Sequence, residues 1–376
     1  MSEFVDRIER VREQMEEQGI DGLVITHPTN RRYLTGFTAD DIPPNESGGY
    51  VLISSESQGL VTGSVNTSQA SAQAPHMNII RRERSWSPHI VEFITDGNHH
   101  RVGYEPFAML EGVFRKTNEL LLEEGHRVEW VDADGLVDQI RMIKTPAEVK
   151  LLKKAFEITC EAFNEVSSTI RAGMTELEVA RALERAMIER GAEGPSFPTI
   201  VASGPHAARP HHEPGSRVIQ EGETIVIDMG ALYEGYCADL TRTVWVGTAD
   251  ERLAEIYGLV YQANEAVIER AHPGLTGKEL DSYARDLITA GGYEEEFSHS
   301  LGHGVGLRVH EGPSASVHSE DIAEAGNTLT IEPGIYVEDW GGVRIEDVLL
   351  FTEDGFEILT STAVKLPIPD RTVGEG

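Results

Sequence analysis

The chain has 376 residues and a formal net charge of −31, from 63 acidic and 32 basic side chains. This length predicts two domains, each long enough to enclose its own hydrophobic core. The acidic residues are spread along the whole chain, which argues against a nucleic-acid partner, because neutralising phosphates needs clustered lysine and arginine.

Lysine is scarce in this acidic sequence. Its lysines are Lys116, Lys144, Lys150, Lys153, Lys154, Lys278 and Lys365. An acidic, lysine-poor surface is typical of adaptation to high salt, where net charge keeps a protein in solution and its self-repulsion is screened. We therefore favour a halophilic protein over an ordinary acidic cytosolic one.

The sequence carries no sign of export or membrane insertion. Its two cysteines, Cys160 and Cys237, provide no disulfide framework, which favours a reducing compartment. An amphipathic helical pattern begins at the N-terminus without a signal peptide, and no apolar run approaches membrane-spanning length. We expect a cytoplasmic protein with no membrane partner.

The first part of the chain alternates helix and strand patterns. Apolar residues from Phe4 to Met15 repeat at helical spacing, and a second helix is predicted over 109–122. Apolar runs predict strands over 22–26, 50–53, 59–61, 102–104 and 128–131. This alternation predicts an α/β domain over residues 1–142.

The pattern changes at residues 141–146. Pro146 suits the first turn of a helix and Thr145 is its predicted cap, so a helix is expected over 147–171. No low-complexity linker separates the two parts. The second domain is predicted to span residues 143–376.

This second domain contains a faint internal duplication. Segments 172–181 and 273–282 align, and each contains a threonine followed three residues later by a glutamate, which predicts a helix capping box. Segment 224–230 aligns with 328–334, and 235–239 aligns with 342–346. Agreement in order and spacing across three blocks is much stronger evidence for a duplication than the helix match alone.

Four carboxylates fall at equivalent places in the repeats. Asp228 and Glu332 end apolar runs, and Asp239 and Glu346 follow a turn. We expect each repeat to form an antiparallel hairpin in which Asp228 opposes Asp239 and Glu332 opposes Glu346. A pseudo-two-fold axis would bring both pairs to one point, whereas repeats stacked side by side would not. Buried carboxylates need partners, and two hard divalent cations would supply them.

Histidines gather in a glycine-rich stretch shortly before the last two acids. His299, His303 and His310 lie within residues 297–313, which suggests a site where backbone and ligand approach closely. The glycines of 302–306 lack the spacing and the following helix of a phosphate loop, so we reject a nucleotide role. A second loop, after a predicted strand over 198–201, contains His211 and His212.

Together these motifs resemble the pita-bread metallopeptidases, specifically the Xaa-Pro group that includes aminopeptidase P and prolidase. The resemblance covers nearly the whole chain, because segment 30–37 is similar to part of the family's creatinase-like N-terminal domain and 141–148 to its domain junction. It implies an α+β fold in which a pita-bread domain with an internal pseudo-two-fold duplication follows a smaller α/β creatinase-like domain. It also implies a homodimer that acts on short proline-containing peptides.

The resemblance assigns roles to individual residues. The family's dinuclear metal ligands correspond to Asp228, Asp239, His303, Glu332 and Glu346. The expected catalytic set consists of three substrate-contacting or proton-handling histidines, one proton shuttle and one arginine that steadies the metal carboxylates: His211, His299, His310, Glu332 and Arg344.

The oxygen-rich ligand set favours two Mn²⁺ ions, with Co²⁺, Fe²⁺ or Zn²⁺ as alternatives. Such ions activate a water and polarise the scissile carbonyl. We expect His310 or His211 to donate a hydrogen bond to that carbonyl oxygen. Glu332 is the expected carrier of a proton from the water to the leaving prolyl nitrogen.

Two positions depart from the prolidase pattern. Ser314 stands where prolidases usually have an arginine that can hold the dipeptide's carboxylate, and Arg308 stands where the family often has an acid. We therefore favour an Xaa-Pro aminopeptidase acting on short peptides; the alternative is an Xaa-Pro dipeptidase (prolidase) in which Arg308 takes over carboxylate recognition. Two other classes are a C–N hydrolase of the same fold acting on a small solute, and a binding protein with a decayed site, against which the intact ligand set argues.

Overall fold

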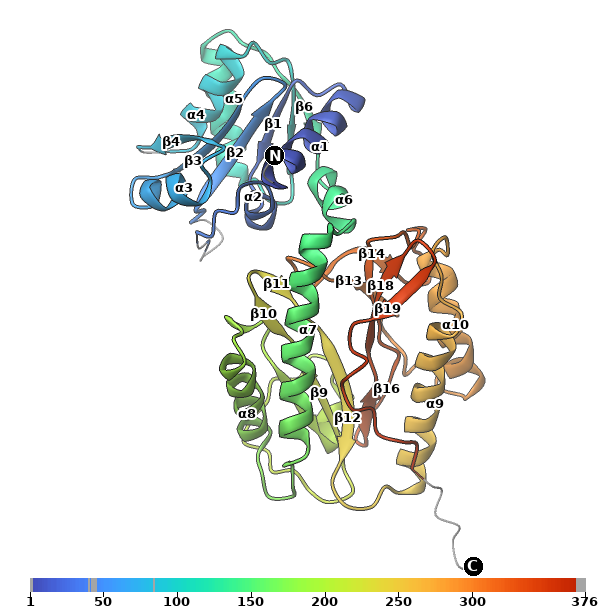
Figure 1. Ribbon diagram of the computed structural model, residues 1–376. Helices are drawn as coiled ribbons and strands as arrows, with labels where there is room; N and C mark the ends of the chain where they lie inside the picture. Colours follow the sequence, from blue (N-terminus) through green and yellow to red (C-terminus); the bar gives the residue numbers. More distant parts are fainter. Residues whose placement is uncertain (1–2, 40, 42–45, 84, 370–376) are drawn as a thin grey trace, which may run out of the picture. The chain divides into compact units, whose positions relative to one another are not determined.

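The computed structural model describes residues 3–39, 41, 46–83 and 85–369. The chain divides into two compact units, Met1–Arg141 and Met142–Gly376 (Figure 1). This division lies one residue before the boundary expected from the sequence.

The first unit is built on a six-stranded mixed sheet with the strand order β4-β3-β2-β1-β5-β6. Its strands are β1 (Gly22–Ile25), β2 (Gly49–Ser54), β3 (Gln58–Gly63), β4 (Asn78–Arg82), β5 (Arg101–Tyr104) and β6 (Glu129–Asp132). Its helices are α1 (Glu3–Glu17), α2 (Pro28–Thr35), α3 (Thr67–Gln73), α4 (Ser87–Asp96), α5 (Glu111–Glu123) and α6 (Leu136–Met142).

The central strands of this sheet explain its sequence pattern. β1 and β2 are buried along their whole length, as continuous apolar runs require. One apolar cluster joins β1, β2 and β3 to α4 and α5, which cover one face of the sheet. The edge strand β4 has no fully buried residue, so its sequence lacks the apolar pattern that would predict it.

The second unit combines four long helices with short strands. Its helices are α7 (Pro146–Ser167), α8 (Glu176–Glu189), α9 (Glu251–Ile268) and α10 (Gly277–Ala290), together with the 3-10 helix η1 (Gly204–Ala208). The strands of its first half are β7 (Gly194–Pro195), β8 (Ile200–Ser203), β9 (Thr224–Met229), β10 (Ala231–Tyr233), β11 (Tyr236–Cys237) and β12 (Leu240–Trp245). Those of its second half are β13 (Gly302–Gly304), β14 (Glu311–Ala315), β15 (Thr328–Ile331), β16 (Gly334–Val337), β17 (Gly341–Arg344), β18 (Asp347–Thr352) and β19 (Gly355–Ile358).

The two halves of this unit have equivalent architectures. In the view of Figure 1, α7 and α8 lie on one side and α9 and α10 on the other, with β9 and β12 between them. Each half has its own apolar core, one formed mainly by α7, α8, β9 and β12, the other by α9, α10, β15 and β18. The predicted α+β fold with an internal duplication is therefore confirmed.

Local details repeat as well. Thr175 and Thr276 each cap a helix, α8 or α10, through a capping box with the glutamate three residues later. Both threonines also form an isolated antiparallel bridge to a later segment, Thr175 with Val218 and Thr276 with Ile322. The repeat extends from the sequence to backbone pairing.

The strand register shows that one of the two predicted carboxylate pairings is wrong and supports the other. β9 and β12 pair with Asp228 opposite Thr241, so the prediction that Asp228 directly opposes Asp239 is wrong. In the second half, Ile331 pairs with Asp347 and Gly334 with Arg344, and this shared register places Glu332 opposite Glu346. The tight turn at Glu234, φ +46°, and Gly235, φ +85°, sets the first register, because both turn residues have positive φ.

Candidate metal centre

Four carboxylates lie where strands of the two halves end. Asp228 is on β9 and Asp239 follows β11, whereas Glu332 follows β15 and Glu346 lies between β17 and β18. Ligand oxygens of Asp228, Asp239 and Glu346 lie within 4.8 Å of one another. A backbone hydrogen bond of 3.1 Å from Glu346 N to Thr241 O joins the two halves at this point.

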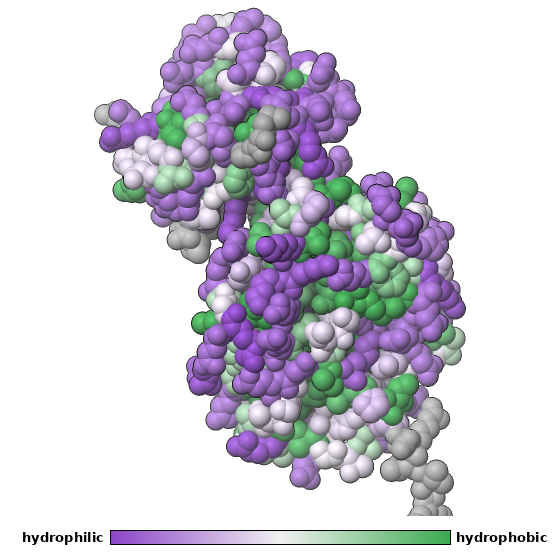
Figure 2. Space-filling view, viewed as in Figure 1, coloured by the Kyte–Doolittle hydropathy of each residue, from purple (hydrophilic) through white to green (hydrophobic). Residues whose placement is uncertain are grey.

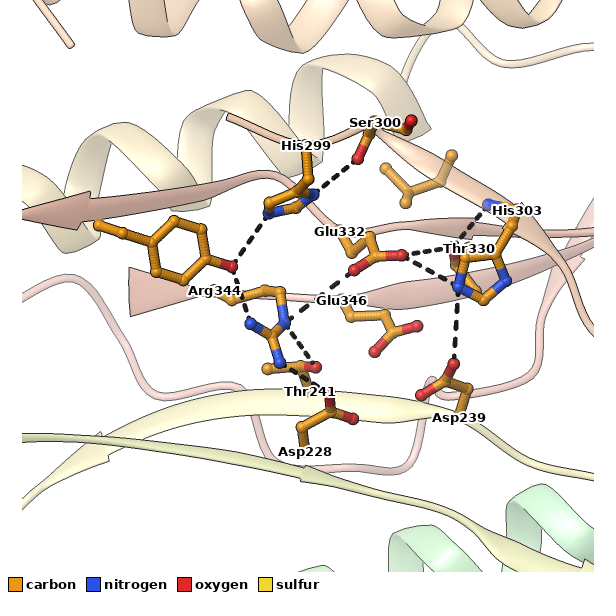
Figure 3. A network of polar contacts seen from close by, with 12 residues as sticks. Asp228, Asp239, Thr241, His299, Ser300, His303, Thr330, Glu332, Arg344 and Glu346 are labelled. Carbon is orange, nitrogen blue, oxygen red and sulfur yellow. Dashed lines mark hydrogen bonds and ion pairs between the residues drawn. The ribbon is translucent and has the colours of Figure 1, made fainter. Parts of the chain in front are cut away.

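His303, on β13, enters the same site through its Nε2 atom. This atom is 3.2 Å from Glu332 Oε1 and 3.8 Å from Asp239 Oδ2 (Figure 3). The other ring nitrogen, Nδ1, faces the carbonyl oxygen of Gly304 at 3.0 Å, which orients the ring and leaves Nε2 directed at the carboxylates. The structure thus brings all five predicted ligands together.

Because these acids are buried close together, keeping them ionised without bound cations is energetically unfavourable. Asp239 is 5 % exposed and Glu346 1 %. Within the described part of the chain, Asp228 Oδ1 and Glu346 Oε1 are buried and accept no hydrogen bond. Buried carboxylate oxygens of this kind need a partner, and hard divalent cations bind such oxygens. The residues present therefore fit a metal centre.

Charge distribution in the metal-free chain leads to the same conclusion. Burial and the neighbouring acids raise the pKa values of Asp239 and Glu346 well above their usual range. Burial also disfavours the charged forms of Glu332 and His303, but their mutual hydrogen bond and attraction outweigh it, lowering the Glu332 pKa to about 2 and raising the His303 pKa to about 9. One imidazolium stabilises one carboxylate, and the remaining acids require further positive charge.

Arg344 connects the acids of the two repeats. Its guanidinium donates to Asp228 Oδ2 at 2.7 Å, to the hydroxyl of Tyr336 at 2.7 Å and to Thr241 Oγ1 at 3.0 Å. The Tyr336 hydroxyl lies 3.0 Å from His299 Nε2, so a continuous chain of contacts links His299 to Asp228 (Figure 3). Burial lowers the pKa of His299, which favours its neutral form.

The other two predicted histidines lie at the open side of the site. The ring of His310 lies 4.4 Å from that of His303, centroid to centroid and nearly perpendicular. Burial and the positive charge of His303 lower the His310 pKa, and His211 contributes in the same direction. His211 is itself exposed.

The two unusual substrate-end residues are also near the centre. Ser314 pairs directly with His303 across the β13–β14 ladder. Arg308 is exposed, and its charge adds to the lowering of the His310 pKa. Neither position is remote from the site that the sequence motifs predict.

Several residues of the site were not predicted from the sequence. Tyr336 bridges His299 and Arg344, and Thr243 Oγ1 both accepts from Arg344 N at 3.0 Å and donates to Arg344 O at 2.8 Å. A tyrosine and a threonine in apolar strands carry no distinctive pattern. The one sequence signal that could have indicated Tyr336 and Thr243 is that each lies close in sequence to one of the aligned acids.

No helix among the described residues is long and apolar enough to cross a membrane.

Comparisons with known proteins cover both units. Residues 7–143 match the creatinase/prolidase N-terminal domain, and residues 150–353 match metallopeptidase family M24. The Xaa-Pro dipeptidase of Pyrococcus furiosus is 36% identical over 364 residues, which cover 96% of this chain and 99% of that protein.

Solved structures give the same result. The Xaa-Pro dipeptidase from Bacillus anthracis superposes with a TM-score of 0.89 at 37% identity, covering 97% of this chain and 99% of that one. The X-Pro aminopeptidase from Thermotoga maritima has a TM-score of 0.84 at 38% identity, with 96% and 98% coverage. With the site geometry described above, these matches establish that the chain belongs to metallopeptidase family M24.

Proposed function

We propose that the chain is a dinuclear metal-dependent peptidase that hydrolyses Xaa-Pro dipeptides. The observation that carries this proposal is the convergence of Asp228, Asp239, His303, Glu332 and Glu346 on one buried site with unsatisfied carboxylate oxygens. The Xaa-Pro relatives support the choice of substrate class.

The donor set supports Mn²⁺ as the physiological ion. Four carboxylates and one imidazole form an oxygen-rich set that suits hard cations, whereas Zn²⁺ prefers nitrogen and sulfur. Co²⁺, Fe²⁺ and Zn²⁺ remain alternatives. Two such ions supply Lewis-acid chemistry, lowering the pKa of a water and polarising the scissile carbonyl.

The side chains around the centre have separate tasks in this mechanism. Glu332, which lies at the centre between His303 and Arg344, is the carboxylate that accepts a proton from the water and passes it to the leaving prolyl nitrogen. Neutral His310 donates a hydrogen bond to the carbonyl oxygen as negative charge develops there. Arg344 and Tyr336 hold Asp228 and His299 in orientation.

The proposed function has two versions, which differ in the length of the peptide that is cleaved. The sequence favours an aminopeptidase, because Ser314 replaces the arginine that can hold a dipeptide's carboxylate. The relatives instead favour the dipeptidase alternative. We adopt the dipeptidase and assign carboxylate recognition to Arg308, which is exposed and close enough to His310 to affect its pKa.

A matched pair of substrates tests this assignment. We expect the Mn²⁺-loaded chain to cleave an Xaa-Pro dipeptide with a higher kcat/KM than the corresponding Xaa-Pro-Xaa tripeptide. Arg308→Gln should raise the KM for the dipeptide with little effect on the tripeptide, because only the dipeptide places its carboxylate on the proline. Preference for the tripeptide would return the function to an aminopeptidase, and cleavage of neither peptide would reject the prolyl substrate class.

We also propose that the protein is adapted to high salt. Hydrophilic residues cover most of the visible surface of the first unit and alternate with hydrophobic areas on the second (Figure 2), and acids outnumber bases by 63 to 32 over the sequence. Salt screens the resulting self-repulsion. The melting temperature should therefore rise as KCl is increased to molar concentration, and an unchanged or falling value would contradict the proposal.

A further inference from the structure

A second group of converging ligand atoms lies outside the candidate metal centre, at Glu176, His206 and His212. Glu176 is the first residue of α8 and is fully buried, His206 lies in η1, and His212 follows in the same loop. His206 Nδ1 is 3.0 Å from Glu176 Oε1, and His212 Nε2 is 2.9 Å from Glu176 Oε2. All three ligand atoms lie within 4.8 Å of one another.

This spacing fits one tetrahedral ion. Zinc–ligand distances of about 2.0–2.2 Å place neighbouring ligand atoms roughly 3.3–3.6 Å apart, a few tenths of an ångström beyond the two contacts above. Two imidazoles and one carboxylate are typical zinc ligands, in contrast to the four-carboxylate centre. The side chain of His206 is 29% exposed, which gives an ion access and leaves room for water as the fourth ligand.

The protein already holds the carboxylate in a fixed orientation. Ser203 donates to Glu176 Oε1 from its backbone N at 2.9 Å and from its hydroxyl at 2.8 Å, and Gly215 N donates to Oε2 at 3.3 Å. The neighbouring Arg217 is paired with Glu223 at 2.8 Å. Arg217 also donates to Ser203 Oγ at 2.7 Å and attracts Glu176 from there, so a cation or a protonated histidine has only the rest of the Glu176 charge to balance.

This cluster is separate from the candidate metal centre but shares a loop with one of its residues. In the β8–β9 pairing, Ile200 faces Asp228 and Ser203 faces Ile225, and three residues of strand span about 10 Å. His206 and His212 flank His211, which is expected to contact substrate. Any ion held by the two flanking histidines would immobilise the segment that carries His211.

We propose that Glu176, His206 and His212 form a site for a transition-metal ion of the zinc type, with water as the fourth ligand, and that this ion fastens loop 203–215 and positions His211. Neither the zinc site nor its test depends on peptidase activity.

Zinc stoichiometry tests the proposal directly. The full-length chain is stripped with a chelator, equilibrated with buffered Zn²⁺ and separated from free ion before bound zinc is measured. His206→Asn keeps a hydrogen-bond donor near Glu176 but removes a ligand, so it should bind about one Zn²⁺ fewer per chain than the unsubstituted protein. Any zinc bound at the candidate metal centre is the same in both proteins and therefore does not contribute to this difference.

Two further variants complete the experiment. His212→Asn should lose the same equivalent, and His318→Asn, an exposed histidine outside both clusters, should retain it. Excess Zn²⁺ should raise the melting temperature of the unsubstituted protein more than that of His206→Asn, because an ion that binds only the folded state stabilises it. Equal zinc content in the unsubstituted protein and in both folded variants would overturn the proposal and leave the cluster as a hydrogen-bonded clamp.

Discussion

The two repeats of the second unit share their helix caps but contribute differently to the candidate metal centre. The first repeat supplies two aspartates, and these are offset by register because Asp228 opposes Thr241. The second supplies two glutamates in direct opposition, Glu332 and Glu346. Both pairs nonetheless reach one site.

The charge balance of the repeats differs more than their geometry. Both basic groups that contact the acids, His303 and Arg344, belong to the second repeat. Each contacts acids of both repeats: Arg344 lies 2.7 Å from Asp228 and 4.0 Å from Glu332, and His303 lies 3.8 Å from Asp239 and 3.2 Å from Glu332. A nearly symmetric scaffold thus carries an asymmetric distribution of charge.

The largest expected effect comes from removing one acid from either repeat. Asp239→Asn and Glu346→Gln preserve shape but remove charge, so each should lower kcat/KM by roughly a thousandfold, about 4 kcal/mol of transition-state stabilisation, and reduce bound metal. Activity assays and metal analysis should agree for both variants. The exposed Glu338→Gln is the matched control. Normal metal content in one variant alone would mean that its repeat does not contribute ligands.

Removing the contact between Arg344 and Asp228, which joins the two repeats, should lower activity less than removing one of the acids. Arg344→Met removes the contact with Asp228, and we expect metal affinity and kcat to fall by about 10–100-fold, as for other residues that orient ligands. Tyr336→Phe leaves that contact in place and should cost less. Equal losses in the two variants would show that the Asp228 contact is not the important one.

Metal binding should release protons, and counting these protons tests the charge distribution at the centre. The pKa of His303 is raised to about 9 and those of Asp239 and Glu346 are raised, so these groups hold protons in the metal-free chain that ligands must give up. Apparent metal affinity should therefore increase as pH rises, by about tenfold per pH unit for each proton released, and level off above pH 9. Calorimetry in buffers of different ionisation enthalpy counts the protons. A pH-independent affinity would contradict the charge distribution described here.

The smallest expected effect is on stability, and it should be of equal size in the two repeats. Thr175→Ala and Thr276→Ala each remove an N-cap, and each should reduce the free energy of unfolding by about 1 kcal/mol. Denaturant titration measures the change, and Thr→Ser variants at the same positions should restore most of it. A markedly larger loss at one position would mean that its bridge, to Val218 or Ile322, adds stability in that repeat alone.

Much of the site was accessible from the sequence because it depends on short-range patterns. Capping boxes need only residues three apart. Asp228 and Glu332 could be identified as special because each ends a buried apolar run. An acid in that position needs a partner wherever the rest of the chain lies.

What the sequence by itself determined, then, was the duplication, the residue types at the centre and the ends of the strands that carry them. Tertiary structure decided the contact of Arg344 with an acid more than a hundred residues away, the insertion of Tyr336 and the meeting of His206 and His212 on Glu176. The physical reason is range: local backbone preferences are encoded in adjacent residues, whereas these contacts depend on how separate elements pack together, within one half for Glu176 and Tyr336 and between the halves for Arg344.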